Sequence, residues 1–286
     1  MKIFVDSANL VEIEEALRRG FPAGITTNPS LMSKEDRTDF KLHIKRIIKL
    51  CERYDRKIPL SVEVFTADPK AMVKQATEFV AEFGEYEGLN VKVPIGWDEL
   101  AVIRELKTRG IRVNCTCCMS FNQAIMAAAA GADFVSLFFG RIRDIGYDAR
   151  SVVESVHRVF KERSVPSEII VGSIRHICDI NDAFMAGADI VTVPPQFFRQ
   201  MVSHPKTDEA VNQFLNDFKK WSPPARRAGA VTERFARAHV VRSVASSRAL
   251  PTIFGNYSVR SGIFMFEADN GRKLWHYKSS QRTGGN

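Results

Sequence analysis

The sequence predicts an α/β protein: a (β/α)8 TIM barrel followed by a basic, poorly structured C-terminal extension. Short apolar runs alternate with helical patterns from residue 2 to residue 193, which is typical of a parallel sheet covered by helices. The segments at 130–136 (AGADFVS) and 186–192 (AGADIVT) repeat one pattern: a helix end, a glycine stop and a buried strand. Eight such β/α units make a compact barrel. The alternative is a doubly wound sheet, which usually carries a glycine-rich phosphate loop; the sequence has no GxGxxG or GxxxxGKS/T motif.

The first half of the barrel follows from four apolar strands and the helices after them. The helix that begins at Asn9 has apolar residues at helical spacing and stops at Gly20. Asn28-Pro29 ends the second strand, and Asp68-Pro69 opens a later helix, because proline suits the first helical turn. The expected strands span residues 2–6, 23–27, 59–65 and 88–94, and the expected helices span 9–19, 36–53, 68–83 and 97–108.

The second half repeats this alternation. The expected strands span residues 111–116, 133–137, 168–173 and 189–193, and the expected helices span 120–130, 148–161 and 177–186. A helical pattern continues over 195–221 until Pro223-Pro224 breaks it. We therefore expect a catalytic barrel domain over residues 1–222 and a basic extension of unknown role over residues 223–286.

The net charge belongs to the extension. Residues 223–286 contain 11 Lys and Arg against 3 Asp and Glu, whereas residues 1–222 contain 30 of each. The barrel thus has no global attraction to nucleic acid or to a membrane. The arginines of the extension are scattered among serine and alanine without a nucleic-acid-binding module, so we favour a solvated tail over a nucleic-acid partner.

Three features bear on location and cofactors. No apolar run approaches the ~18 residues of a membrane-spanning helix, and Met1 leads directly into a strand. The five cysteines, an odd number, suit reduced thiols better than a disulfide framework. Cys115, Cys117 and Cys118 have no partner pair or nearby histidine to complete a zinc site. We expect a cytoplasmic protein without membrane contact, metal or cofactor.

Lys92 is the most informative residue, because it lies within the apolar run GLNVKVP over residues 88–94. Such near-continuous apolar runs are typical of parallel strands covered on both faces. Burying an ammonium is costly, and desolvation favours the neutral amine, which forms a Schiff base with a carbonyl. The alternative is a lysine that reaches past the strand end to a carboxylate. This run alone leaves the two interpretations evenly balanced.

Polar residues at the ends of the other strands shift that balance. Chemistry in a barrel takes place at the C-terminal ends of the strands, and seven of the eight expected strands carry polar residues there. Asp6 and Glu63 are carboxylates available for proton transfer, and Thr116 is able to hold a water molecule. The remaining candidates are amides for substrate hydroxyls, Asn28 and Asn114; a hydroxyl, Ser136; and a cluster suited to a phosphate, Arg141, Ser173 and Arg175.

Each of these residues also has a purely structural interpretation. Asp6 is placed to cap the next helix. Glu63 could form a salt bridge with Lys92 and take no part in catalysis, and Arg141 and Arg175 could belong to an ion-pair network below the barrel rim.

The motifs resemble the transaldolase family. The matching segments are MKIFVDSAN at 1–9, GITTNPS at 24–30, VKVP at 91–94, NCT at 114–116, SLFFGR at 136–141 and SIR at 173–175. They occur in order across about residues 1–221 and are most similar to the short subgroup that also contains the fructose-6-phosphate aldolases.

This resemblance implies a (β/α)8 barrel and a class I mechanism without metal or cofactor. The lysine at position 92 would form a Schiff base with fructose 6-phosphate or sedoheptulose 7-phosphate and retain a dihydroxyacetone unit. That unit passes to erythrose 4-phosphate or glyceraldehyde 3-phosphate, as in the non-oxidative pentose phosphate pathway. Asp6 would assist proton transfer, and Glu63 and Thr116 would hold the catalytic water. Asn28, Asn114 and Ser136 would contact the sugar, and Arg141, Ser173 and Arg175 would bind its phosphate.

Two positions favour a transferase over an aldolase that releases dihydroxyacetone. Transaldolases resemble this chain in having Glu at 63 and Phe at 138 among the residues around the substrate, whereas the aldolases usually have Gln and Tyr. The chain departs from the family at Phe139, which we expect to add bulk near the substrate. The final helix of the short subgroup packs on a neighbouring subunit, so the resemblance also implies a homo-oligomer.

Overall fold

A computed structural model of the protein describes residues 1–36, 38–54, 57–221, 263–267 and 273–277. The chain divides into two compact units, Met1–Phe218 and Lys219–Asn286. Within the second unit, β9 (Ile263–Glu267) pairs antiparallel with β10 (Lys273–Tyr277). The rest of the extension expected over 223–286 lies outside the described residues.

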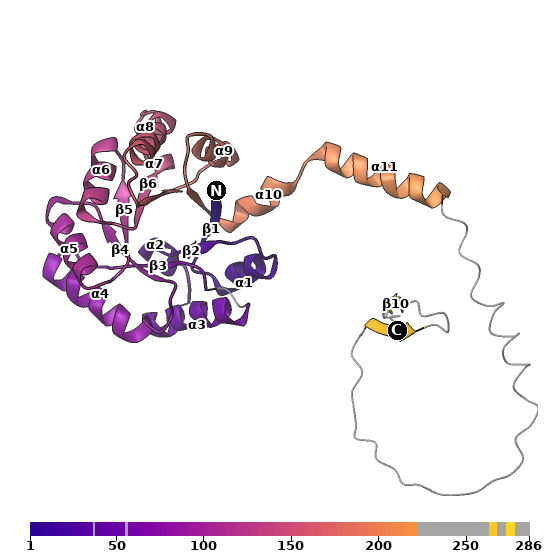
Figure 1. Cartoon of the computed structure of the whole chain (residues 1–286), viewed down its shortest axis with the longest axis horizontal. Coiled ribbons are helices and arrows are strands. Elements are labelled where there is room, and N and C mark those ends of the chain that lie inside the picture. Colours follow the sequence, from indigo (N-terminus) through magenta and orange to yellow (C-terminus); the bar gives the residue numbers. More distant parts are fainter. Residues whose placement is uncertain (37, 55–56, 222–262, 268–272, 278–286) are drawn as a thin grey trace, which may run out of the picture. The chain divides into compact units, whose positions relative to one another are not determined.

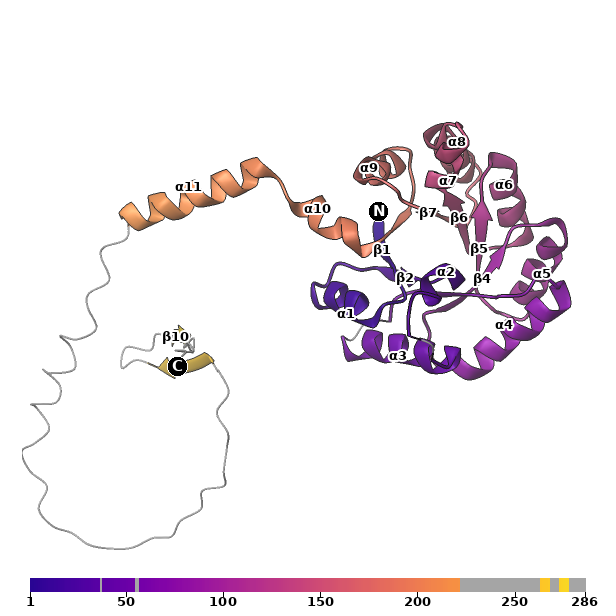
Figure 2. The same cartoon turned by 180° about the vertical axis from the view of Figure 1, so that it is seen from behind.

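The first unit confirms the predicted (β/α)8 barrel. Its eight strands form a closed parallel barrel in the order of the sequence, and β1 pairs with both β2 and β8. The helices that alternate with the strands, such as α3, α4, α5 and α8, surround this barrel (Figures 1 and 2). The strands are β1 Lys2–Asp6, β2 Gly24–Thr26, β3 Leu60–Glu63, β4 Leu89–Pro94, β5 Val113–Cys118, β6 Phe134–Phe138, β7 Glu168–Gly172 and β8 Ile190–Val193.

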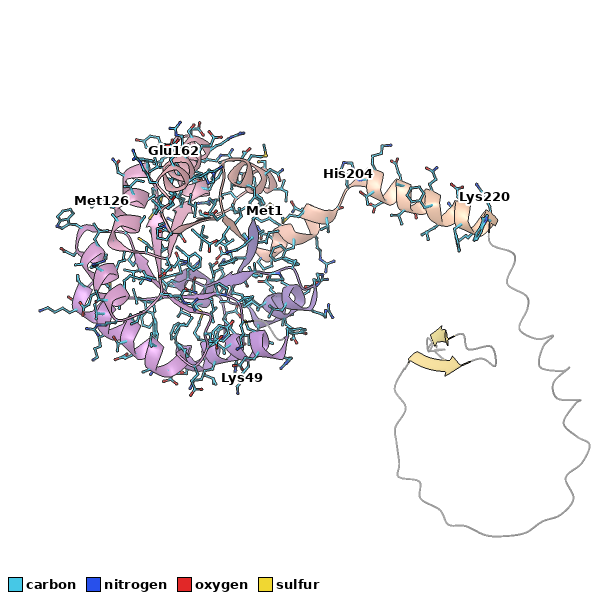
Figure 3. The ribbon with its side chains drawn as sticks, viewed as in Figure 1. Met1, Lys49, Met126, Glu162, His204 and Lys220 are labelled. Carbon is cyan, nitrogen blue, oxygen red and sulfur yellow. The ribbon has the colours of Figure 1, made fainter. Side chains whose placement is uncertain are left out.

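The helices alternate with these strands. They are α1 Leu10–Arg18, α2 Pro29–Met32, α3 Phe40–Arg53, α4 Pro69–Phe83, α5 Trp97–Thr108, α6 Phe121–Ala130, α7 Phe139–Asp144, α8 Ala149–Glu162, α9 Ile177–Met185, the short 3-10 helix Pro195–Phe197, α10 Phe198–Val202 and α11 Pro205–Trp221. Outward side chains such as Lys49, Met126 and Glu162 lie around the ring (Figure 3). None of the helices within the described residues is long and apolar enough to cross a membrane.

The structure differs from the sequence prediction in how the segments at 29–53 and 195–221 are divided. The helix expected from residue 36 begins at Phe40, because the Asp39 side chain accepts a hydrogen bond from the Leu42 amide (2.9 Å) and caps it there. A separate short helix, α2, begins after Asn28. The pattern over 195–221 is three helical segments rather than one, and α7 was not predicted.

The repeated aspartates of the sequence hold the N-terminal ends of neighbouring strands together. Asp133 Oδ2 accepts a hydrogen bond from the Val113 amide (2.7 Å), and Asp189 Oδ2 accepts one from the Ile169 amide (2.8 Å). Lys107 also donates to Asp133, with 2.6 Å between Nζ and Oδ1. The repeated aspartates therefore join neighbouring strands at the N-terminal end of the barrel, opposite the end where the candidate site residues lie.

An apolar cluster fills the interior of the barrel below the C-terminal ends of the strands. Phe4, Phe134, Ile170 and Ile190 form a separate buried cluster, in which the rings of Phe4 and Phe134 meet edge to face with centroids 6.4 Å apart. Successive side chains of a strand point to opposite faces. The residues two positions further along these strands therefore also face inward, and they form the floor of the site.

Candidate active site

A pocket of about 320 Å³ opens at the C-terminal ends of the strands. Its walls bring together side chains from all eight strands or the segments that follow them. The predicted site residues that line it are Asp6, Asn28, Glu63, Lys92, Thr116, Ser136, Phe138, Arg141 and Ser173. Asp6 and Ser173, which are 167 positions apart in the sequence, thus meet in one cavity because the barrel closes.

Lys92 lines this pocket and is buried, with 4% of its surface exposed. Its Nζ lies 3.0 Å from Glu63 Oε2 and donates to the Thr27 carbonyl oxygen at 2.9 Å. The pairing register between β3 and β4 puts Glu63 directly beside Lys92. A carboxylate so close is placed to accept a proton from the ammonium and release the free amine. The salt bridge weighed as an alternative for Glu63 is present, and it lies inside the pocket.

Asp6 ends β1, and its carboxylate faces the same cavity. Its Oδ1 accepts a hydrogen bond from the Thr26 hydroxyl (2.8 Å). Burial raises the pKa of Asp6 above its ordinary value, against the opposing effects of Lys92 and the Thr26 hydrogen bond. Asn9, rather than Asp6, caps α1 by accepting from the Val11 and Glu12 amides. The capping role considered for Asp6 is therefore filled by another residue.

Thr116 and Cys117 form the wall from β5. Thr116 Oγ1 is buried and has no hydrogen-bond partner among the residues that the structure describes, so its hydroxyl is available to a water molecule or a substrate. Cys117 adopts a left-handed backbone (φ 61°) where the β5–β6 register shifts. Burial, and secondarily the Glu63 carboxylate, raise the pKa of the Cys117 thiol, so it does not compete with the lysine as a nucleophile near neutral pH.

The two candidate amides occupy different positions. Asn28 lines the pocket and caps α2, where its Oδ1 accepts from the Leu31 amide (2.9 Å). Asn114 is completely buried and does not line the pocket. Its Oδ1 accepts from the Ser136 hydroxyl (2.7 Å) and its Nδ2 donates to Ser61 Oγ (3.1 Å). These bonds hold Asn114 behind Ser136, which does reach the pocket.

Arg141 brings a second positive charge, besides Lys92, to the lining of the pocket. Its guanidinium carbon lies 5.8 Å from the centre of the Phe138 ring, an arrangement that orients the cation by a cation–π interaction. Ser173 lies nearby in a left-handed backbone (φ 57°). Strained backbones of this kind are concentrated at functional sites. A guanidinium beside a hydroxyl is suited to an anionic group such as a phosphate.

Arg175 lies outside the pocket. Its Nη2 pairs with Asp144 Oδ2 at 2.6 Å, and both side chains are about half exposed. The backbone amide of Arg175 donates to Asp179. Of the two arginines predicted to bind a phosphate, the structure thus brings only Arg141 into the cavity and gives Arg175 the surface ion pair that was the alternative.

The expectation that Phe139 adds bulk near the substrate is wrong. Phe139 is the first residue of α7, is 1% exposed, packs in the main hydrophobic core and does not line the pocket, so it does not add bulk beside the substrate. Ser61 and Thr192 were not predicted. Thr192 occupies the position in the second repeat that Ser136 occupies in the first, and the repeat could have identified it.

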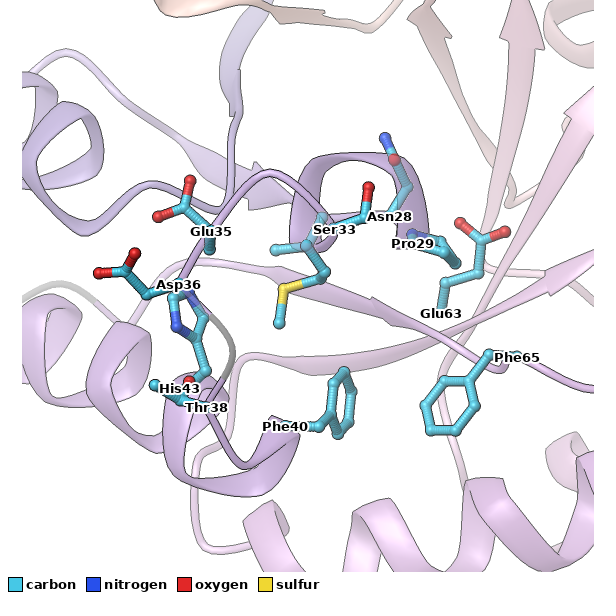
Figure 4. Close-up of a pocket in the computed structure, with 12 residues that line it drawn as sticks. Asn28, Pro29, Ser33, Glu35, Asp36, Thr38, Phe40, His43, Glu63 and Phe65 are labelled. Carbon is cyan, nitrogen blue, oxygen red and sulfur yellow. The ribbon is translucent and has the colours of Figure 1, made fainter.

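A larger cavity of about 470 Å³ adjoins this pocket. Asn28, Pro29 and Glu63 line both cavities. Phe40 and Phe65 form its apolar side, with ring centroids 5.2 Å apart, and the carboxylate of Glu63 lies on the opposite side from Glu35 (Figure 4). Glu63 is therefore accessible from two directions, one of which does not pass Lys92.

Comparison with known proteins identifies relatives over the whole barrel. The family described as "Transaldolase/Fructose-6-phosphate aldolase" matches residues 3–241. A protein of Desulfosudis oleivorans named "Probable transaldolase" is 40% identical over 220 residues, which cover 77% of this chain and 99% of the relative. Proteins with the same name from Syntrophomonas wolfei and Dehalococcoides mccartyi are 39% and 38% identical, over 77% of this chain and 99% and 98% of theirs.

Proposed function

The chain belongs to the transaldolase/fructose-6-phosphate aldolase family, and we infer that it is a transaldolase that works through a Schiff base on Lys92. The observation that carries this mechanism is the buried Lys92 ammonium, 3.0 Å from Glu63 in a pocket that also holds Asp6 and Arg141. The substrates are a ketose phosphate donor, sedoheptulose 7-phosphate or fructose 6-phosphate, and an aldose phosphate acceptor, glyceraldehyde 3-phosphate or erythrose 4-phosphate.

Catalysis begins when Lys92 loses a proton to the Glu63 carboxylate. The free amine attacks the ketose carbonyl carbon, and the carbinolamine then loses water to give the imine. The Thr116 hydroxyl, which has no partner among the described residues, would hold that water between itself and Glu63. The protonated imine withdraws electrons from the neighbouring carbon–carbon bond and so prepares it for cleavage.

Cleavage requires removal of a proton from the hydroxyl beside the breaking bond. Asp6 accepts this proton while the electron pair of the bond moves into the imine system. The aldose phosphate leaves, and a dihydroxyacetone unit stays on Lys92. An acceptor aldehyde then reacts by the reverse steps, with Asp6 returning the proton. Arg141 and Ser173 hold the phosphate, and Arg175 could join them only by leaving Asp144.

The transferase is favoured over the alternative, an aldolase that releases dihydroxyacetone. Glu63 and Phe138 are the residues that resemble transaldolases, and the three relatives carry that name. No tyrosine hydroxyl at position 138 is present to promote release. We place the reaction in the non-oxidative pentose phosphate pathway and in the cytoplasm, which agrees with five cysteines that form no disulfide.

Trapping the intermediate tests this function. The protein is incubated with fructose 6-phosphate, reduced with borohydride and digested, and the modified peptide is mapped by mass. We expect a three-carbon adduct on Lys92, because cleavage leaves that unit on the amine. Adding erythrose 4-phosphate before reduction should diminish the adduct and form sedoheptulose 7-phosphate. Borohydride-treated protein of unchanged mass would contradict the Schiff base, and free dihydroxyacetone as the main product would favour the aldolase.

We also propose that the enzyme is a homo-oligomer assembled through α11. This helix has no buried residue. Its apolar side chains Val211, Phe214, Leu215 and Phe218 are 49–69% exposed and repeat at the spacing of one helical face. A face of this kind is typical of an interface between subunits.

Charge reversal of this face should dissociate the oligomer. We expect Phe214→Lys with Leu215→Lys to weaken association at least 100-fold, since burying each apolar side chain contributes about 1.5–3 kcal/mol. Light scattering during size-exclusion chromatography measures the mass. Gln213→Lys adds a charge to the opposite face and should leave the mass unchanged. A wild-type protein that runs as a monomer at micromolar concentration would contradict the proposal.

A further inference from the structure

Thr192 is connected to Asp6 through a chain of two hydroxyl groups. Thr192 Oγ1 lies 2.5 Å from Thr26 Oγ1, which in turn lies 2.8 Å from Asp6 Oδ1. Both threonines are buried, with 5% and 2% of their surfaces exposed, and both line the substrate pocket. They come from β8 and β2, the two strands that pair with β1 on either side of it.

The number of available protons fixes the direction of this chain. A hydroxyl has one proton to donate and two lone pairs to accept with, whereas an ionised carboxylate only accepts. The Thr26 proton is therefore used on Asp6 Oδ1. The short contact between the two hydroxyls must then use the proton of Thr192, so the chain runs from Thr192 to Thr26 to Asp6.

We propose that Thr192 is a positioning residue of this transaldolase: by donating to Thr26, it directs the Thr26 hydroxyl at Asp6 Oδ1 and leaves Oδ2 as the oxygen that takes the substrate proton. Asp6 Oδ2 has no hydrogen-bond partner among the described residues. Without Thr192, the Thr26 hydroxyl would still reach Asp6 but would no longer be polarised by a second donor. The catalytic role of Asp6 in this inference rests on the proposed function.

The charged groups around Asp6 take no part in the hydrogen bonds that link Thr192, Thr26 and Asp6. Lys92 faces it from β4, Glu63 from β3, and Lys34 from the segment after α2. A change at position 192 removes a neutral group and leaves these charges in place. Its effect on Asp6 is therefore carried by the hydrogen bonds alone.

The first test measures the titration of Asp6 directly and does not depend on turnover. Protein labelled with 13C at aspartate carboxyl carbons is titrated by NMR, with the Asp6 signal assigned from Asp6→Asn. A hydrogen bond donated to a carboxylate favours its ionised form. Thr192→Val removes the hydroxyl at constant shape, so we expect Asp6 to titrate at higher pH than in the wild type. Thr192→Ser keeps the hydroxyl and loses a methyl group that lies near Gly172, and it should titrate as the wild type does.

The second test follows catalysis and the dependence of one threonine on the other. We expect Thr192→Val to lower kcat about 5- to 10-fold, the effect of one hydrogen bond, with KM within about twofold and the acidic limb of the kcat profile moved to higher pH. Thr192→Ser should recover most of this loss. Adding Thr192→Val to Thr26→Val should produce no further decrease, because Thr192 acts only through Thr26.

Two results would overturn the assignment. One is an Asp6 titration that is identical in Thr192→Val and wild type. The other is a decrease in kcat that adds fully to that of Thr26→Val, which would mean that Thr192 serves packing or the substrate directly. A wild-type protein that forms no adduct with fructose 6-phosphate would refute the proposed function instead, and the NMR titration would still decide the hydrogen-bond chain.

Discussion

Replacing Lys92 with methionine is expected to abolish both the borohydride-trapped adduct and transaldolase turnover, with kcat/KM lower by about 10⁴-fold or more. The side chains are similar in length, and methionine has no nitrogen to attack the ketose. Exchange between fructose 6-phosphate and erythrose 4-phosphate, monitored with coupled enzymes, gives the rate. Binding of the substrate through Arg141 should persist, so the loss should appear in kcat more than in KM.

The matched control for this variant is Lys107→Met. Lys107 is also a partly buried lysine in an ion pair, with Nζ 2.6 Å from Asp133 Oδ1, but it lies on α5 outside the pocket. We expect this variant to keep the adduct and the activity. Lys92→Met leaves Glu63 without its partner, so Lys92→Met with Glu63→Gln should recover stability but not activity. An adduct that persists in Lys92→Met would assign the Schiff base to another residue.

Asp6→Asn is expected to lower kcat about 10²- to 10⁴-fold, the usual contribution of a positioned acid–base group. The amide keeps the shape of the side chain and its hydrogen bond from Thr26, but it cannot accept the substrate proton. Schiff-base formation on Lys92 does not need that proton transfer. We therefore expect borohydride to trap the intact six-carbon sugar instead of a three-carbon unit. A three-carbon adduct formed at the wild-type rate would exclude Asp6 from the cleavage step.

The same substitution should make the folded protein more stable at neutral pH. Burial raises the pKa of Asp6 above its ordinary value of 3.8, so the folded protein binds this proton more tightly than the unfolded chain does. The stability of the wild type relative to Asp6→Asn therefore falls as pH rises from 3.8 through the folded pKa. Urea unfolding at several pH values should show an advantage for Asp6→Asn that grows as the pH rises above 3.8 and disappears toward pH 3.8.

Asp148→Asn is the opposite case and serves as the control. Asp148 is exposed and caps α8, where hydrogen bonds from the Ser151 hydroxyl and amide lower its pKa. Its contribution to stability is present above its ordinary pKa and is lost as the pH falls through the lowered folded pKa. Asp148→Asn should therefore be no more stable than the wild type at neutral pH. Equal pH dependence for the two variants would argue against a buried, destabilising charge at Asp6.

The fold was predictable because its signals are local and repeated. Each buried strand has its own apolar run, and the glycine stops and capping residues mark where helices begin and end. The errors lie where two local signals compete. Asp36 and Asp39 are both plausible caps, and only the hydrogen bond from Leu42 to Asp39 decides between them. The breaks after residue 195 depend on tertiary packing that the helical period does not encode.

The candidate site was predictable to the extent that barrel geometry determines it. The C-terminal ends of the strands meet at one end of the barrel, so Lys92, Glu63 and Asp6 could be grouped from the sequence. The hydrogen-bond and ion-pair partners of individual side chains follow no such rule. Arg175 turns to Asp144 instead of the pocket, and Asn114 is held behind Ser136. Thr192 was overlooked because threonine is common in strands and carries no charge.

Closure of the barrel by β1 and β8 has a consequence for synthesis of the chain. Lys2 pairs with Ile190 and Val5 with Val193, so the first strand cannot complete its pairing until the eighth has left the ribosome. At ~5–20 residues per second, the N-terminal strand waits roughly 10 to 40 s with one edge unpaired. The hydroxyls on either side of Asp6 come from the earliest and the latest parts of the barrel. The nascent chain therefore contains Lys92 well before it has an assembled catalytic centre.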